Sequence, residues 1–142
     1  MRIEPPSVYV SDTGTAKGRG VFASKAFRKE EVVEICAVIV LRGSFRKLPV
    51  EIQRLVYGWH LLASEPGTHA LSFGYGSLYN SANPANMSFH ADRHEALLRF
   101  IAARDILADE ELTVNYSSTG GGARSTTNDW FKRLNVKFVP AR

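Results

Sequence analysis

The segment GYGSLYNSANPANMSF, residues 74–89, limits the possible folds of this chain more than any other stretch. It places Asn80, Asn83 and Asn86 among large apolar side chains such as Tyr79. Asparagine competes with the backbone for hydrogen bonds and favours turns, whereas aromatic side chains favour burial. We therefore expect an irregular segment that lies inside the protein instead of on its surface.

The length of 142 residues suits one domain, so a single domain is expected over residues 1–142. Hydrophobic residues make up 44% of the chain and charged residues 23%, which indicates a globular protein and excludes a disordered or fibrous one. The longest apolar run, Ile35 to Leu41, is too short to span a membrane, and the N-terminal residues have no signal-peptide core. These features predict a cytoplasmic protein. The single cysteine, Cys36, permits neither an internal disulfide nor a multi-cysteine zinc site.

The net charge of +4 raises the possibility of nucleic-acid binding. The basic residues are scattered among acids without any block of five like charges, which favours a solvated basic surface. A small basic β module for nucleic acid stays open as an alternative. The chain has no HExxH, CxxC, GxSxG or phosphate-loop motif, and its four histidines lack the spacing of metal ligands. No metal site is therefore expected.

Alternating and β-branched residues predict a mostly β fold built from short strands. Pro49 suits the first position of a short helix that places Ile52, Leu55 and Val56 on one face. The expected strands are residues 7–11, 20–24, 32–41, 69–73, 87–91, 97–106 and 111–116.

The C-terminal part, residues 117–142, is expected to form a lid or tail segment. It begins with SSTGGGARSTTN, which has the composition of a flexible loop. Asn128 follows as a candidate cap for a helical turn that carries Trp130 and Phe131.

Three short features stand out in chain order: KGRG at residues 17–20, the asparagine segment, and DEELTVNY at residues 109–116. Together with DWF at residues 129–131, they make the chain resemble the SET-domain protein lysine methyltransferases over nearly its whole length. The resemblance implies a SET fold of small curved sheets around a pseudoknot, in which the strand ending in Tyr116 passes beneath the asparagine segment. Such threading is rare in proteins.

The resemblance also implies S-adenosylmethionine as the cofactor and names the residues that would hold it. The glycine loop would hold its methionine portion, Asn80 and Ser81 its amine and adenine, and Trp130 would stack on the adenine. The family usually has histidine at the position of Ser81, so a weaker hold on the cofactor is expected. The complete set of expected cofactor-binding residues is Lys17, Gly18, Arg19, Gly20, Asn80, Ser81, Tyr116, Trp130 and Phe131.

For the reaction, the resemblance implies Tyr116 as the catalytic residue, with its hydroxyl beside the transferring methyl. An aromatic channel would desolvate the target amine and so disfavour its charged form. The expected channel residues are Tyr57, Tyr75, Tyr79 and Phe89. For Tyr57 and Tyr75, a position in the core is an equally good interpretation because both lie in apolar surroundings.

Phe89 lies nine residues after Asn80, where the family places a Phe or Tyr that sets the number of methyl groups added. Phenylalanine there implies methylation beyond the first methyl group. The implied partner is a lysine-containing protein such as a histone, a ribosomal protein or a DNA-packaging protein. A SET-like module that binds a protein tail without transferring methyl groups is the alternative.

Overall fold

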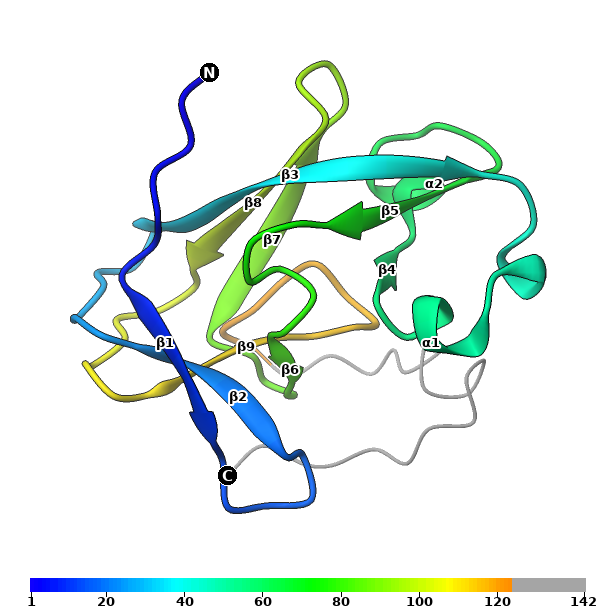
Figure 1. Cartoon of the computed structure of the whole chain (residues 1–142). Helices are drawn as coiled ribbons and strands as arrows, with labels where there is room; N and C mark the ends of the chain where they lie inside the picture. The colour runs from blue at the N-terminus through cyan, green and yellow to red at the C-terminus, as the bar shows by residue number, and fades with distance from the viewer. Residues whose placement is uncertain (124–142) are drawn as a thin grey trace.

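The computed structural model describes residues 1–123, and these fold into two β-sheets with short helices between strands (Figure 1). The first sheet has the order β1 (Val8–Asp12), β2 (Arg19–Ala23), β9 (Glu111–Val114) and β6 (Asn80–Ser81). The second has the order β4 (Val56–Tyr57), β5 (Thr68–Ser72), β3 (Val32–Arg42), β8 (Leu97–Ala102) and β7 (Met87–Asp92). Three short helices precede β5: η1 (Phe45–Lys47), α1 (Val50–Gln53) and α2 (Trp59–Leu62). The mostly β fold is confirmed.

The long strand β3 organises the second sheet because it pairs antiparallel with β5 along one half and with β8 along the other. Its alternation buries Val33, Cys36 and Val38. The register with β8 shifts between Val32 and Glu34, as in a β-bulge. A bulge adds one residue and redirects a side chain. This explains why Glu34 follows the buried Val33 yet is itself only 4% exposed.

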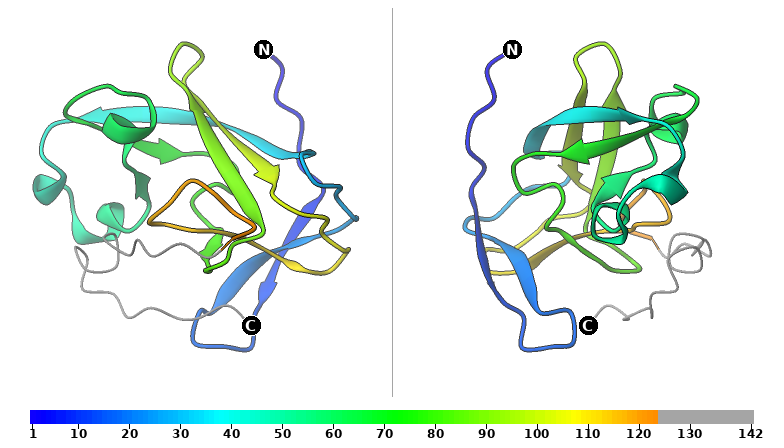
Figure 2. Two further views of the ribbon diagram at one scale, coloured as in Figure 1. Left: turned by 180° about the vertical axis from the view of Figure 1, so that it is seen from behind. Right: turned by 45° about the vertical axis from the view of Figure 1, so that its right-hand side comes forward.

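The hairpin of β1 and β2 lies at one end of the molecule, and the region from β4 to α2 lies at the other (Figure 2). The asparagine segment and the residues after β9 lie between these ends in each view (Figures 1 and 2). This middle region is therefore where the two sheets meet.

Phe100 on β8 is the centre of the aromatic part of the core. It is fully buried, and its ring centroid lies 5.0 Å from that of Tyr79 and 5.9 Å from that of Phe89. Burial of one such side chain stabilises the fold by about 1.5–3 kcal/mol. Trp59, Met87 and Leu98 are fully buried around the same core.

The asparagine segment is buried and irregular, as the sequence predicts. Asn83 and Asn86 are 9% and 4% exposed, although Leu78 at the edge of the segment is 50% exposed. The two residues of β6 pair in parallel with Thr113 and Val114 of β9. The side chain of Asn86 also bonds β9, since its Nδ2 donates to the Glu111 carbonyl oxygen at 2.8 Å. Segment and strand thus lie directly against each other.

Two expected elements differ from the structure. The helix from Pro49 is only one turn long, α1, and Val56 belongs instead to β4. The strand expected over residues 97–106 ends at Ala102, and Ile106 makes an isolated bridge with Phe27 after a turn. Both Val56 and Ile106 are nevertheless buried, so each packs on the core from a different element than the pattern predicts. Other strands agree with the expected bounds within two residues.

Among residues 1–123, no helix is long and apolar enough to cross a membrane. The same residues contain no group of three or more His, Cys, Asp or Glu side chains arranged to hold a metal ion.

Candidate active site

Tyr116 follows β9 directly and is attached to the asparagine segment by two hydrogen bonds. Its backbone N–H donates to the Ser81 hydroxyl at 3.2 Å, and its phenol donates to the Tyr79 carbonyl oxygen at 2.6 Å. The serine at position 81 therefore supplies a side-chain contact that positions Tyr116. The short bond from the phenol fixes the direction of the Tyr116 ring.

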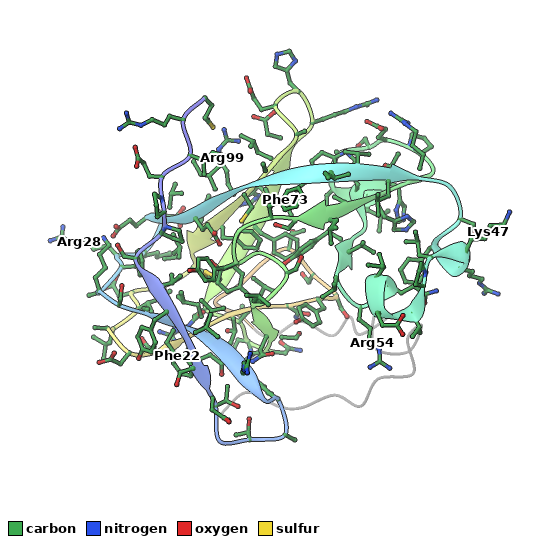
Figure 3. All side chains as sticks on the ribbon, in the orientation of Figure 1. Phe22, Arg28, Lys47, Arg54, Phe73 and Arg99 are labelled. Atoms are coloured by element: carbon green, nitrogen blue, oxygen red, sulfur yellow. The ribbon has the colours of Figure 1, made fainter. Side chains whose placement is uncertain are left out.

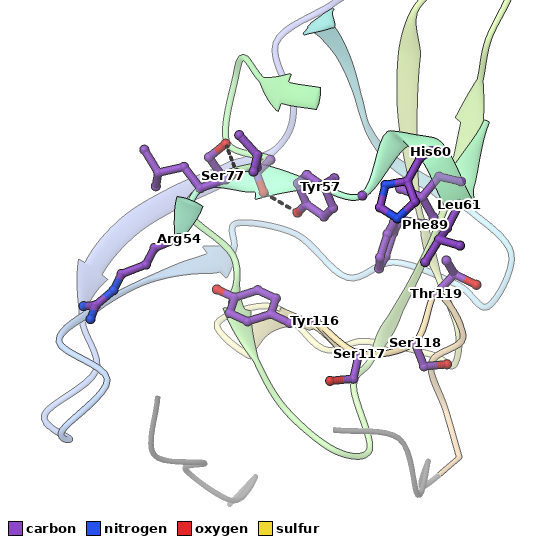
Figure 4. Close-up of a pocket in the computed structure, with 15 residues that line it drawn as sticks. Arg54, Tyr57, His60, Leu61, Ser77, Phe89, Tyr116, Ser117, Ser118 and Thr119 are labelled. Atoms are coloured by element: carbon purple, nitrogen blue, oxygen red, sulfur yellow. Dashed lines mark hydrogen bonds between the residues drawn. The ribbon is translucent and has the colours of Figure 1, made fainter. Parts of the chain in front are cut away.

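A cavity of about 320 Å³ lies beside Tyr116, between the region of residues 54–62 and the residues that follow β9. Its wall includes Tyr57, Phe89 and Tyr116, three of the residues predicted for catalysis or the channel. The rings of Tyr57 and Tyr116 lie between Arg54 on one side and Phe89 with His60 on the other (Figure 4). The cavity is therefore lined on several sides by aromatic rings.

The hydroxyl groups of Tyr57 and Tyr116 both donate their protons to the backbone. Tyr57 donates to the Gly76 carbonyl oxygen at 2.6 Å, and Tyr116 donates to the Tyr79 carbonyl oxygen at the same distance (Figure 4 marks the first bond). A phenol has one proton and two lone pairs. Each oxygen also has lone pairs with which it can accept hydrogen bonds.

Burial keeps both phenols protonated. Burial, with a smaller contribution from Glu111, raises the pKa of Tyr116 to about 12. The pKa of Tyr57 is raised well above 10.0, mainly because burial disfavours the phenolate. Near neutral pH these two groups accept and donate hydrogen bonds, and neither acts as a base.

Aromatic contacts hold the channel side chains in place. The rings of Tyr57 and Phe89 meet edge to face with centroids 5.2 Å apart. Phe100 lies behind both, 6.2 Å from Tyr57 and 5.9 Å from Phe89. Edge-to-face geometry is the favoured arrangement of aromatic pairs. The core therefore fixes the shape of this wall.

The residues after Tyr116 complete the cavity. The Thr119 carbonyl oxygen accepts a hydrogen bond from the Phe89 N–H at 3.0 Å, which ties this segment to β7. Ser117 lines the cavity, and its buried hydroxyl has no hydrogen-bond partner in the described part of the chain. Buried hydroxyls without partners are uncommon and costly. A bound molecule would supply the missing partner.

The KGRG residues, the glycine loop of the sequence analysis, span the end of the loop between β1 and β2 (Lys17 and Gly18) and the start of β2 (Arg19 and Gly20). Gly18 has φ +77°, a left-handed conformation that favours glycine. The Gly18 carbonyl oxygen accepts bonds from the Thr13 N–H at 2.8 Å and the Thr13 hydroxyl at 2.6 Å, which closes the loop. An added Cβ at Gly20 would lie 2.5 Å from Glu111 Oε2 and 2.9 Å from Thr13 Cγ2, so these side chains would have to shift.

Asn80 joins this loop to β9. Its Nδ2 donates to the Arg19 carbonyl oxygen and to Glu111 Oε2, each at 2.8 Å. The structure thus brings Arg19, Gly20, Asn80 and, through Ser81, Tyr116 into one connected group. Lys17 belongs to the same loop, where its backbone N–H donates to the Thr15 hydroxyl at 3.3 Å.

Tyr75 and Tyr79 lie away from the cavity lining. Tyr79 is fully buried, and its hydroxyl donates to Glu34 Oε1 at 2.6 Å. The other oxygen of Glu34 accepts the Tyr75 N–H at 3.0 Å. Tyr75 packs against the hydrophobic core. Trp130 and Phe131 lie outside the described residues, as does Asn128.

A protein-family model described as the SET domain matches residues 18–117, which is more than half of the chain. The chain belongs to the SET domain family. The matched range of this SET domain runs from Gly18 in the glycine loop to the residue after Tyr116, and so it contains every connected site residue described above.

One relative of this SET domain is a histone-lysine N-methyltransferase of Schizosaccharomyces pombe that is specific for lysine 37 of histone H3. The two are 27% identical over 100 residues, which is 70% of this chain and 67% of the relative. Together with the family match, this likeness places the SET domain, at family level, among lysine methyltransferases.

Solved structures share the fold. A Plasmodium falciparum crystal structure matches with a TM-score of 0.63 and 23% identity, over 80% of this chain and 95% of that chain. A chain of the Chaetomium thermophilum Polycomb Repressive Complex 2, solved with bound S-adenosylmethionine, matches with a TM-score of 0.62 and 19% identity. That match covers 93% of this SET domain and 17% of the other chain.

The sequence interpretation missed several residues of the SET domain site. Arg54, His60 and Leu61 line the cavity although they belong to no recognised motif. Glu111 contacts Asn80, and its only sequence signal was its place at the start of the ELTVNY stretch. The cavity residues near α2 gave no signal because one-turn helices and two-residue strands have no measurable periodicity.

Proposed function

We propose that this SET domain transfers a methyl group from S-adenosylmethionine to the side-chain amine of a lysine in a protein substrate. The observation that carries the proposal is the pair of phenol oxygens of Tyr57 and Tyr116 at one cavity, with both protons already bound by backbone carbonyls. Two such acceptors suit an amine, because each can accept one of its N–H groups and so direct the nitrogen lone pair.

The residues present fit the proposed cofactor. Asn80 Nδ2 donates to the Arg19 carbonyl oxygen at 2.8 Å, so the backbone beside Gly20 is held close to Asn80. Within residues 1–123, both side-chain hydrogen bonds of Asn80 use Nδ2. Its Oδ1 can therefore accept a hydrogen bond from the cofactor's ammonium group. The unpartnered Ser117 hydroxyl offers a further polar contact. We propose that Lys17, Gly18, Arg19, Gly20, Asn80, Ser81, Tyr116, Trp130 and Phe131 hold the cofactor.

When bound, the cofactor supplies a methyl group on a positively charged sulfur. The chain's own part is to bring the amine into line in its neutral form, because only the neutral amine has a free lone pair. A lysine free in water has a pKa of about 10.4 and is mostly charged near neutral pH. The rings of Tyr57, Phe89 and Tyr116 line the cavity, so an amine placed among them loses contacts with water, which disfavours its charged form.

Tyr116 is the proposed catalytic residue because its oxygen can touch the reacting amine. Since burial raises its pKa to about 12, the phenol remains protonated and acts by orienting the amine. Tyr57 is proposed to share this role from the opposite wall. Phe89 carries no hydroxyl, so a partly methylated amine keeps room to turn, and we propose that the reaction continues past the first methyl group. Aromatic faces also attract the methylated ammonium through cation–π contact.

Labelled methyl transfer tests the proposal. The full chain is incubated with methyl-labelled S-adenosylmethionine and a panel of histones, ribosomal proteins and DNA-packaging proteins, and mass spectrometry locates the label. The expected result is label on lysine side chains of at least one protein. A tail-binding module without transferase activity gives protein binding with no label, and a cofactor titration that shows no binding supports that alternative.

A further inference from the structure

Arg54 is the residue with a permanent charge in the described lining of the cavity. Among residues 1–123, the lining includes Arg54 and His60 but no aspartate or glutamate. The nearby carboxylates are used elsewhere, since Glu34 accepts from the Tyr79 hydroxyl and Glu111 accepts from the Asn80 amide. A peptide bound at the mouth of this cavity would therefore meet the positive charge of Arg54 and no carboxylate among the described lining residues.

Arg54 is placed to contact such a peptide. It is exposed at the end of α1, and none of the ion pairs formed by the described residues involves it. Figure 4 shows its guanidinium extending away from the other lining residues, at one edge of the pocket. A guanidinium with five donors binds carboxylates well and repels another cation at short range.

Exposed leucines lie on the same lining. Leu61 is 77% exposed and Leu55 is 37% exposed, and both belong to the cavity wall. Large apolar side chains at a concave surface lose exposure when a ligand covers them, and this favours binding of apolar groups. The mouth of the cavity therefore combines the exposed guanidinium of Arg54 with the exposed apolar side chains of Leu55 and Leu61.

We infer that the mouth of this cavity selects a lysine whose neighbours in the substrate are acidic and apolar, and disfavours a lysine within a run of arginines and lysines. The inference rests on the proposed function, because it describes the substrate of the same site. An acidic neighbour meets the opposite charge of Arg54, whereas a basic neighbour meets a like charge and finds no carboxylate in the described lining.

Peptide binding tests the inference separately from methyl transfer. Fluorescent peptides share one central lysine and differ only in flanking glutamates, glutamines or arginines, and fluorescence anisotropy measures their affinity for the full chain. The acidic peptide is expected to bind roughly threefold to tenfold more tightly than the basic one at low salt, the range of a few exposed charge contacts. High salt should reduce the difference because it screens exposed charges.

Arg54→Glu should reverse the preference, and Arg54→Gln should remove most of it. The matched control is Arg28→Glu, which changes the net charge equally at an exposed arginine on a different side of the molecule (Figure 3). The control should keep the preference. Equal or tighter binding of the basic peptide, no measurable binding of any peptide, or loss of preference in both charge variants overturns the inference.

Methyl transfer to the same peptides is measured in parallel. Labelling of the acidic peptide supports the proposed function as well as the inference. If the acidic peptide binds with the expected preference but no peptide is labelled, the substrate inference stands and the transferase proposal fails. If label is transferred without charge preference, the transferase proposal stands and the substrate inference fails.

Discussion

The phenol of Tyr116 donates its proton to the carbonyl oxygen of Tyr79 at 2.6 Å. The hydroxyl of the same Tyr79 donates to the buried carboxylate of Glu34, also at 2.6 Å. Tyr79 thus connects the candidate catalytic residue to the core through both its backbone and its side chain. The orientation of Tyr116 at the cavity depends on this buried support.

Replacement of Tyr79 by phenylalanine tests whether the Tyr79 side chain stabilises the core or contacts the substrate in the channel. The change removes the bond to Glu34 and leaves a buried carboxylate oxygen without that partner, which should cost about 1–3 kcal/mol of unfolding free energy. The backbone bond to Tyr116 remains, so the folded variant should transfer methyl groups at a rate within about threefold of the parent rate. A threefold change corresponds to roughly 0.6 kcal/mol of activation free energy. Urea denaturation and methyl-transfer rates measure the two effects. A large loss of rate with unchanged stability would place Tyr79 in the channel instead.

Gly20→Ala tests whether close packing at the glycine loop supports cofactor binding. The added methyl group would lie 2.5 Å from Glu111 Oε2, the atom that accepts from Asn80 Nδ2. Relief of this overlap should move the Glu111 carboxylate away from Asn80 and weaken S-adenosylmethionine binding at least tenfold, while overpacking costs about 1–3 kcal/mol of stability. Isothermal titration calorimetry measures the affinity.

Gly120→Ala is the matched control, because an added Cβ there meets no atom of residues 1–123 within 4 Å. It should leave cofactor affinity unchanged. Equal affinities for the parent, Gly20→Ala and Gly120→Ala would show that the glycine loop has no part in holding the cofactor.

Stability should fall in alkaline solution because buried tyrosines resist ionisation. Burial raises the pKa of Tyr57 and Tyr79 well above 10.0 and that of Tyr116 to about 12. The unfolded chain ionises near the ordinary value, so this stabilisation is fully present below pH 10 and is lost as the pH rises toward the folded-state values. Between about pH 9 and about pH 11, the unfolding free energy should fall by roughly 1–3 kcal/mol.

Urea denaturation across this range measures the pH effect, and Tyr116→Phe supplies the comparison. The variant lacks the phenol of Tyr116, one of the buried phenols with raised pKa, so its stability should fall less steeply than that of the parent. Identical slopes for the two proteins would mean that Tyr116 ionises as freely in the folded chain as in water.

Phe89→Tyr should change the number of methyl groups added. Phe89 lines the cavity and meets Tyr57 edge to face at 5.2 Å, so a hydroxyl added to its ring would crowd the space beside the amine. The parent is expected to give dimethyl or trimethyl lysine, and the variant is expected to stop largely at monomethyl lysine. Mass spectrometry of the product over time distinguishes them. Only monomethyl product from the parent would contradict the role of Phe89.

The sequence predicts the parts of the fold that have regular patterns. Alternation of apolar and polar residues predicts most of the strands. The presence of Asn86 among apolar neighbours predicts the buried irregular segment. Other features depend on tertiary contacts that no local pattern encodes. The bulge that turns Glu34 into the core is one, and the one-turn helix α2 is another.

The site could be predicted only in part for the same reason. Tyr79 and Asn80 are adjacent in the chain but point to different surroundings, the first toward Glu34 and the second toward the glycine loop. Aromatic residue type alone does not distinguish a channel wall from a core. The proposed role of Arg54 depends on the fact that no aspartate or glutamate belongs to the described cavity lining. That fact becomes visible only when the cavity is assembled.

The most direct measurement compares labelled methyl transfer by the parent chain and by Tyr116→Phe, at saturating S-adenosylmethionine, on the best protein substrate. The account predicts that the variant binds the cofactor and remains folded, yet transfers methyl groups at least about 100-fold more slowly, a loss of roughly 2.7 kcal/mol of transition-state stabilisation. Equal rates for the two proteins would contradict the assignment of the Tyr116 oxygen to the reacting amine.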